Sequence, residues 1–208
     1  MVAVALGAAA VAAVVDWIAV ARERRGVEYV AKPLTMAALV VVAITLDPAN
    51  EVRRNWFAAA AVLSLAGDVF LMLPRDRFVA GLVAFLGAHL CYLAGLLQEP
   101  WQPASGIVGF GIVIVAVALV GGQVLRAVRR TAPSLFVPVV VYLVVIATMV
   151  VTAFGAGPAL AIAGAVLFFA SDSVLAMERF VRRTRWGSVV VMVTYHLGQA
   201  GLVLSLGC

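Results

Sequence analysis

The sequence predicts an all-α integral membrane protein, a bundle of eight transmembrane helices. Of its 208 residues, 65% are hydrophobic and only 12% are charged. A soluble domain is closer to half apolar and a quarter charged, so this chain has too little polar surface to cover a water-soluble globule. The apolar residues form long runs, as membrane helices require, and the basic residues collect in alternate loops between the runs.

The predicted spans, within a single membrane domain 1–208, are 1–21, 33–47, 56–73, 78–97, 104–125, 134–154, 157–177 and 187–206. The first run has no basic segment before it and three arginines after it, so we interpret it as a retained helix and not as a cleaved signal. The second run is short, but Pro33 suits the first turn of a helix and Lys32 can extend to the interface. None of the runs alternates as barrel strands do.

Basic residues predict the orientation. Loops one, three, five and seven carry thirteen of the fifteen Lys and Arg residues, and the even loops carry only Arg53 and Arg54. By the positive-inside rule the odd loops are cytoplasmic, and both termini lie on the non-cytoplasmic side. The two arginines of the even loop are the one local contradiction.

The net charge of +5 does not indicate nucleic-acid binding, because the basic residues are spread over short loops. Cys91 and Cys208 form neither a disulfide framework nor a metal-binding spacing. Fourteen arginines against one lysine, with abundant Ala and Val, indicate a GC-rich coding bias. We therefore expect a bacterial protein of the cytoplasmic membrane.

Two carboxylates lie inside apolar runs, Asp68 in LSLAGDVFLML and Asp172 in LFFASDSVLAM. Each costs about 2.5–3.5 kcal/mol to insert, and intramembrane ionisable groups are functional by default. On the predicted topology both lie roughly 8–9 Å inside the cytoplasmic interface. The structural alternative is an ion pair near that interface, for example between Asp68 and Arg75 or Arg77.

Further polar residues gather in the same half of the bundle, and helical spacing places several of them on shared faces. Ser64 shares a face with Asp68; His89 and Tyr92 follow one stripe, and Tyr195 and Gln199 follow another. Polar, glycine-containing stripes face other helices and not lipid. Each residue also has a structural reading: a neutral core histidine, packed tyrosines, an interface anchor for Lys32, and packing for His196.

Six short motifs follow one another along the chain. They are K-P at Lys32–Pro33, G-D-x-x-L at Gly67–Leu71, F-x-x-G-x-x-x-F-x-x-x-H-x-x-Y at Phe78–Tyr92, P-x-x-x-Y at Pro138–Tyr142, S-D at Ser171–Asp172 and Y-x-x-x-Q at Tyr195–Gln199. In this order they resemble the YhhN/TMEM86 family of membrane proteins, whose characterised members are lysoplasmalogenases. The first helix and residues 98–130 carry none of these motifs.

The resemblance implies hydrolysis of the vinyl ether bond of a 1-alkenyl lyso-glycerophospholipid to a fatty aldehyde and a glycerophospho-alcohol. Asp68 and Asp172 are then the expected catalytic pair. One protonates carbon to give an oxocarbenium ion and the other, ionised, stabilises it and draws a proton from water, as in glycoside hydrolysis. The expected orienting or substrate-binding residues are Lys32, which meets the phosphate, and Ser64, His89, Tyr92, Tyr142, Ser171, Tyr195 and Gln199. No metal or other cofactor is expected.

Two alternatives from other classes remain at this point. One is a small proton-coupled transporter, which also uses Asp, His and Tyr inside a bundle. A transporter would also need polar groups in the outer half of the bundle, and this sequence has few of them there. The other is a lipid-binding or scaffold protein whose aspartates only hold helices together. The sequence leaves open which aspartate is the acid, the native lipid and the oligomeric state.

Overall fold

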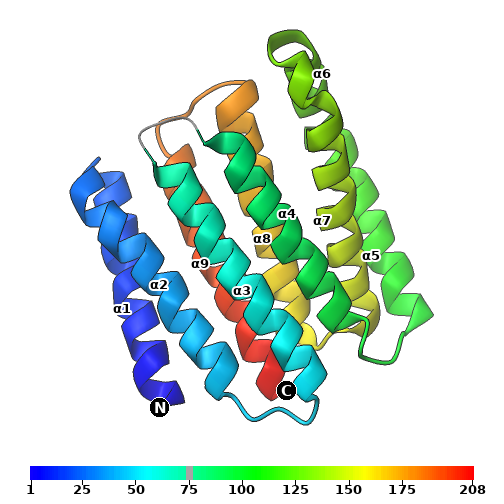
Figure 1. Cartoon of the computed structure of the whole chain (residues 1–208). Coiled ribbons are helices and arrows are strands. Elements are labelled where there is room, and N and C mark those ends of the chain that lie inside the picture. Colours follow the sequence, from blue (N-terminus) through cyan, green and yellow to red (C-terminus); the bar gives the residue numbers. More distant parts are fainter. Residues whose placement is uncertain (74–76) are drawn as a thin grey trace.

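The computed structural model describes residues 1–73 and 77–208, and the regular structure in that part of the chain is helical. The elements are α1 (Val2–Ala21), α2 (Arg25–Thr45), α3 (Glu51–Met72), α4 (Phe78–Leu96), α5 (Pro103–Ala116), a π-helical segment (Val117–Gly121), α6 (Gly122–Thr131), a 3₁₀ turn (Pro133–Leu135), α7 (Phe136–Ala156), α8 (Ala159–Phe180), α9 (Gly187–Leu204) and a last 3₁₀ turn (Ser205–Gly207). Figure 1 shows them as one bundle with both termini at the same end.

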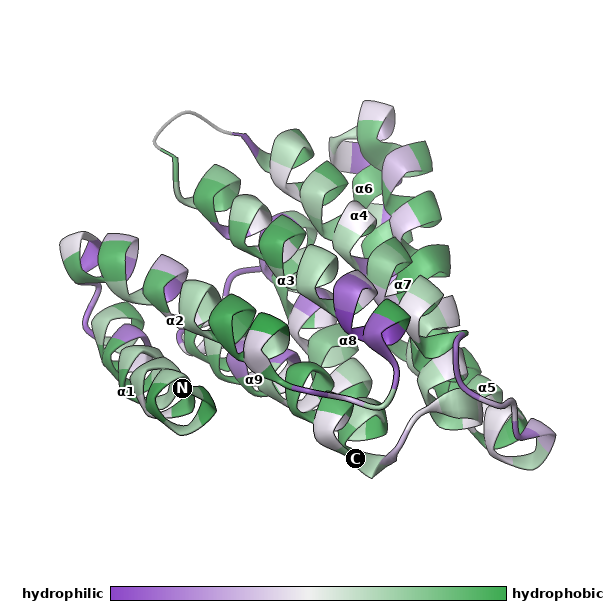
Figure 2. Cartoon of the chain, turned by 60° about the horizontal axis from the view of Figure 1, so that its bottom comes forward, coloured by the Kyte–Doolittle hydropathy of each residue, from purple (hydrophilic) through white to green (hydrophobic). Residues whose placement is uncertain are grey.

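The prediction of eight spans is confirmed: eight helical segments among the described residues are long and apolar enough to cross a membrane. α5, the π-helical segment and α6 follow one another without a break and together make one of them, Pro103–Thr131. The hydropathy colouring of Figure 2 shows mostly hydrophobic helices, with hydrophilic residues concentrated at helix ends and in loops. The protein is therefore a multi-pass membrane protein.

The second span begins earlier than the apolar run indicated. α2 starts at Arg25, so Pro33 lies inside the helix and the prediction that it occupies the first turn was wrong. Lys32 likewise does not open the helix; it lies about two turns into α2 and is only 4% exposed. The first turns of α2 contain Arg25 and Glu28, so the apolar run begins later than the helix does. Hydropathy alone cannot detect the part of a helix that lies beyond the hydrocarbon layer.

Two other loops were also placed differently. Arg53 belongs to the first turn of α3 and is 4% exposed; its guanidinium lies 3.4 Å from Glu99 and donates to Ser205 at 3.1 Å. Arg53, one of the two arginines that contradicted the predicted charge pattern, is thus a buried structural residue and not a loop charge. Arg126, Arg129 and Arg130 lie in α6, which prolongs the fifth span. Arg75 lies outside the described residues.

The helices pack so that α9 is central, against α8 on one side and α1, α2 and α3 on the other. α4 lies between α3 and α7, and α5 packs on α7 (Figure 1). Glycines bring α8 and α9 together: a Cβ on Gly164 would lie 2.6 Å from the amide nitrogen of Leu202, and one on Gly198 would lie 2.8 Å from that of Phe168. Small residues at such a crossing are typical of membrane helix pairs.

Candidate functional site

Asp68, on α3, is held in a buried ion pair. Lys32 Nζ lies 3.1 Å from its Oδ1, and the Tyr195 hydroxyl donates to its Oδ2 at 2.8 Å. The side chains of Lys32 and Asp68 are 5% and 1% exposed. A carboxylate removed from water needs both a counter-charge and hydrogen-bond donors, and this one has both. Lys32 is therefore a partner of the carboxylate and not the interface residue that its spacing suggested.

The hydrogen-bonding neighbours of Asp172, on α8, are a tyrosine and a histidine. Tyr142 donates to its Oδ2 at 2.5 Å, and His89 Nε2 lies 3.1 Å from the same oxygen and 2.9 Å from the tyrosine hydroxyl. Within the described chain its Oδ1 makes no hydrogen bond, and the side chain is 14% exposed. No lysine or arginine among the described residues pairs with Asp172. The two carboxyl groups are thus held in different ways.

Both carboxyl groups face a shared cavity near one end of the bundle. Asp68, Asp172, Lys32, Tyr195 and Ser171 line it, with Glu28, Glu178 and Ser188 toward the helix ends. We call this space the polar cavity. The sequence expectation that two aspartates from separate spans meet in one pocket agrees with this geometry.

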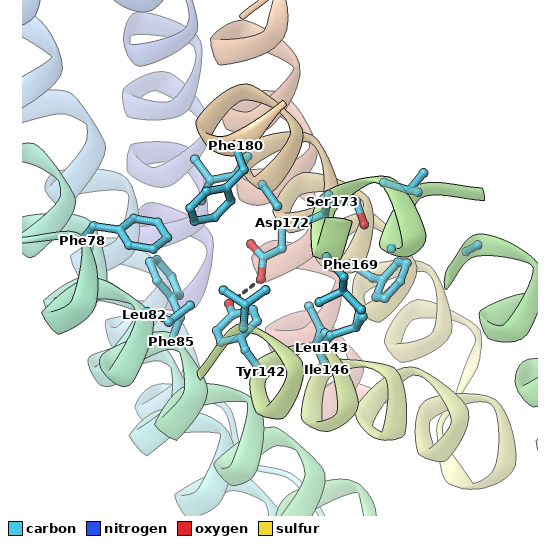
Figure 3. A pocket seen from close by; sticks show the side chains of 18 of the residues that line it. Phe78, Leu82, Phe85, Tyr142, Leu143, Ile146, Phe169, Asp172, Ser173 and Phe180 are labelled. Atoms are coloured by element: carbon cyan, nitrogen blue, oxygen red, sulfur yellow. Dashed lines mark hydrogen bonds between the residues drawn. The ribbon is translucent and has the colours of Figure 1, made fainter. Parts of the chain in front are cut away.

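An apolar cavity adjoins the polar one. It lies among α3, α4, α7, α8 and the α5–α6 span, and its lining is aliphatic and aromatic except near Asp172. Figure 3 shows Asp172 with Tyr142 at its wall, among Phe78, Leu82 and Phe85. Counted together with the space at its open side, its empty volume is about 790 Å³. Asp172, Leu71, Phe85 and Leu175 line both cavities.

Aromatic rings fix the side chains that contact the aspartates. Phe168 packs edge-on against the rings of both His89 and Tyr195, with ring centroids 4.6 and 5.4 Å apart. Phe85 packs edge-on against Tyr195 at 5.8 Å. Because closely packed rings cannot easily change rotamer, these contacts hold the histidine and the tyrosine in place.

Other sequence-predicted residues make no hydrogen bond to the two carboxyl groups among the described residues. The Tyr92 hydroxyl donates to Gln199 Oε1 at 2.5 Å, and neither residue lines the two cavities. Ser171 lines the polar cavity, but its hydroxyl donates to the Val191 carbonyl at 3.0 Å. The Ser64 hydroxyl is buried with no hydrogen-bond partner in the described chain.

Sequence reasoning did not select Asp16 as a site residue. It is fully buried in α1, and neither carboxyl oxygen has a hydrogen-bond partner among the described residues. The neighbouring Trp17 donates to His196 Nδ1 at 3.1 Å, so His196 is more than packing. An aspartate inside an apolar run was the signal that found Asp68 and Asp172, and it applied equally to Asp16.

Among the described residues, no three His, Cys, Asp or Glu side chains gather closely enough to hold a metal ion. The chemistry available at this site is that of carboxyl, phenol, imidazole and ammonium groups beside an apolar space. Such a set can transfer protons to a substrate that carries a long hydrocarbon chain.

Comparisons with known proteins agree with this architecture. Residues 27–206 match the YhhN family. A Mycobacterium tuberculosis protein named lysoplasmalogenase is 39% identical over 179 residues, which cover 83% of this chain and 67% of the relative. Human lysoplasmalogenase TMEM86B is 31% identical over 146 residues, covering 70% of this chain and 61% of the relative. No solved structure matches the chain.

Proposed function

Because this chain belongs to the YhhN family, we propose that it is a membrane-embedded lysoplasmalogenase-like hydrolase. Its substrate is a 1-alkenyl lyso-glycerophospholipid, and its products are a fatty aldehyde and a glycerophospho-alcohol. One observation carries the proposal: carboxyl groups from α3 and α8 line one polar cavity, and one of them also lines an adjoining apolar cavity.

The apolar cavity is suited to the alkenyl chain. Aliphatic and aromatic side chains surround it, so an alkenyl chain that enters from the lipid phase exchanges one apolar environment for another. A chain lying there brings its vinyl ether to the cavity's polar boundary at Asp172. The glycerol then lies in the polar cavity, where Lys32, Ser171 and Tyr195 are found.

Asp172 is the better placed proton donor. Its Oδ2 accepts hydrogen bonds, as the carbonyl oxygen of a carboxylic acid does, while Oδ1 is without a partner in the described chain and can carry the proton. It also borders both cavities. Asp68, ion-paired with Lys32, has no free oxygen for this role. A positioned acid contributes typically 10²–10⁴-fold to rate.

In the proposed reaction Asp172 acts first as the acid and then as the base. The proton on Oδ1 is transferred to the alkenyl carbon farther from the ether oxygen, which leaves an oxocarbenium ion and the Asp172 carboxylate. Water adds to the cationic carbon and returns a proton to the carboxylate. The hemiacetal then loses its hydroxyl proton and breaks its carbon–oxygen bond to the glycerol, whose oxygen takes up a proton, giving the aldehyde and the free hydroxyl. Tyr142 and His89 stabilise the carboxylate while it is charged.

Asp68 acts in this scheme as a fixed ionised group. With Lys32 and Tyr195 it forms a preorganised array of charges and dipoles that lines the same polar cavity as the acid. Fixed dipoles of this kind stabilise a developing cation without rearranging during the reaction. Its oxygens are already engaged, so removal of a proton from water falls to Asp172. The sequence expectation divided proton donation and proton removal between the two aspartates, whereas in this scheme Asp172 performs both.

The experiment is aldehyde release by purified wild type, Asp172→Asn and Asp68→Asn in non-ionic detergent. Both variants keep the side-chain shape, and each is expected to lose at least 100-fold in kcat. Asp47→Asn, at an exposed loop position, is the matched control and should keep full activity. Thermal melting of each variant separates loss of chemistry from loss of fold.

Substrate analogues complete the test. The saturated-ether and acyl lyso-lipids should give no aldehyde, because neither contains a bond whose protonation leads to one. Full activity in either aspartate variant would overturn the two-carboxylate proposal. A wild type that binds lyso-lipid and releases no aldehyde would favour a lipid-binding or transport role.

A further inference from the structure

A third cleft opens at the same end of the bundle as the polar cavity, and it is rich in arginine. Four arginines line it: Arg77 before α4, Arg179 in the last turn of α8, and Arg183 and Arg185 in the α8–α9 loop. Glu23 and Glu178 are its acidic members. We call it the arginine cleft.

The arginine cleft adjoins the polar cavity. Val20, Leu71, Leu175, Glu178 and Ser188 line both spaces. Leu71 and Leu175 also line the apolar cavity, so all three spaces border these two leucines. The three spaces are thus neighbours, as the parts of one bound lipid would require.

Among the described residues that line the cleft, four arginines stand against two glutamates, which leaves an excess of positive charge. Within the described chain, Arg77, Arg183 and Arg185 form no ion pair, although Arg185 lies over the Trp186 ring at 5.2 Å. Glu178 is already engaged, since its Oε1 accepts from both the amide and the hydroxyl of Thr184. Guanidinium groups suit phosphate because they can donate two hydrogen bonds in parallel.

The spacing fits a glycerophospholipid. Arg179 lies seven positions after Asp172 in α8, so the two residues are roughly 10 Å apart along the helix axis. In the substrate only the glycerol carbons and one oxygen separate the vinyl ether from the phosphate, and arginine side chains reach several ångströms inward. Lys32, the other candidate for the phosphate, is held by Asp68.

We propose that the arginine cleft binds the phosphate of the substrate headgroup, with Arg183 and Arg185 as the principal ligands, and that it thereby selects phosphate-bearing lyso-lipids over neutral 1-alkenylglycerols. This inference rests on the proposed function, because the alkenyl chain and the reacting bond orient the lipid toward the cleft.

The experiment compares two substrates that share the vinyl ether, a 1-alkenyl lyso-phosphatidylethanolamine and a 1-alkenylglycerol without phosphate. Arg183→Gln and Arg185→Gln should each raise KM for the phospholipid about tenfold, the loss expected for a charge-assisted hydrogen bond, and leave kinetics on the alkenylglycerol unchanged. Arg130→Gln is the matched control, because it removes the same charge. Arg130 is exposed in α6 and lines none of the three spaces. It should change neither substrate.

A second readout does not require turnover. Binding of the uncleavable saturated-ether lyso-phospholipid, measured in dodecyl maltoside, should weaken about tenfold in both variants relative to wild type and Arg130→Gln. If wild type releases no aldehyde but this binding difference persists, the proposed function fails and the phosphate site stands. Equal KM and equal binding in all variants would overturn the phosphate site and leave these arginines as topology signals only.

Discussion

At the scale of single residues, the two aspartates have the same sequence setting and different surroundings. Asp68 is ion-paired with Lys32, whereas Asp172 has Tyr142 and His89 on one oxygen. Sequence reasoning found both aspartates and their partners but not the pairing. The local sequence around an aspartate predicts its burial and cannot predict which distant helix supplies its partner.

Tyr142→Phe tests the surroundings of Asp172. The substitution keeps the ring and removes the hydroxyl that donates to the carboxylate. Because loss of one such donor costs on the order of 10²–10³-fold in rate, kcat for aldehyde release should fall about 100-fold while KM stays within twofold. Tyr29→Phe, at an exposed position in α2, is the control. An unchanged kcat would remove Tyr142 from the reaction.

At the scale of helices, the pair α8 and α9 decides the site geometry. Asp172 lies on α8 and Tyr195 on α9, so the distance between their helices sets the width of the polar cavity. Glycines at positions 164, 198 and 201 let the backbones approach closely. The sequence placed these glycines in apolar runs but did not indicate which helix each would contact.

Gly164→Ala tests this helix contact. Its new Cβ would lie 2.6 Å from the Leu202 nitrogen and 2.8 Å from the Gly198 oxygen, and backbone atoms cannot rotate away. Overpacking of this kind costs typically 1–3 kcal/mol, so melting temperature and activity should both fall. Gly111→Ala, with nothing within 4 Å of its Cβ, is the control and should melt no lower than wild type. Equal melting of the two variants would contradict the close-packing argument.

The fifth span is also a matter of helix geometry. Its π-helical segment, Val117–Gly121, contributes Val120 and Gly121 to the wall of the apolar cavity. π-helical turns are rare and frequent at functional sites. Hydropathy predicted a helix over 104–125 but not the change in winding, because a π turn depends on local packing and leaves no compositional signal.

At the scale of the whole molecule, both termini lie at one end and the polar cavity lies toward the other, where the α1–α2 and α8–α9 connections lie (Figure 1). The positive-inside rule predicts that this second end is cytoplasmic. We therefore propose that the active site serves the cytoplasmic leaflet of the cell membrane.

Cysteine labelling in intact cells checks this orientation. Cys208, exposed at the C-terminus, should react with a membrane-impermeant maleimide added outside. In a C208A background, R130C should react only after the membrane is opened, because α6 lies at the other end of the bundle. The reverse pattern would invert the topology and place the cavity on the outer side.

Composition and helical periodicity alone determined the class of protein, the eight spans and the half of the bundle in which polar side chains gather. Each of these follows from local quantities: about twenty apolar residues cross the hydrocarbon, and charge in short loops sets orientation. The tertiary structure alone decided the pairings, since Tyr195 and Asp68 are 127 residues apart and meet only because α9 packs against α3. It also decided that Lys32 neutralises a carboxylate, that Arg53 is buried and that Asp16 joins the interior, because the contacts of a buried charge depend on how all neighbouring helices pack.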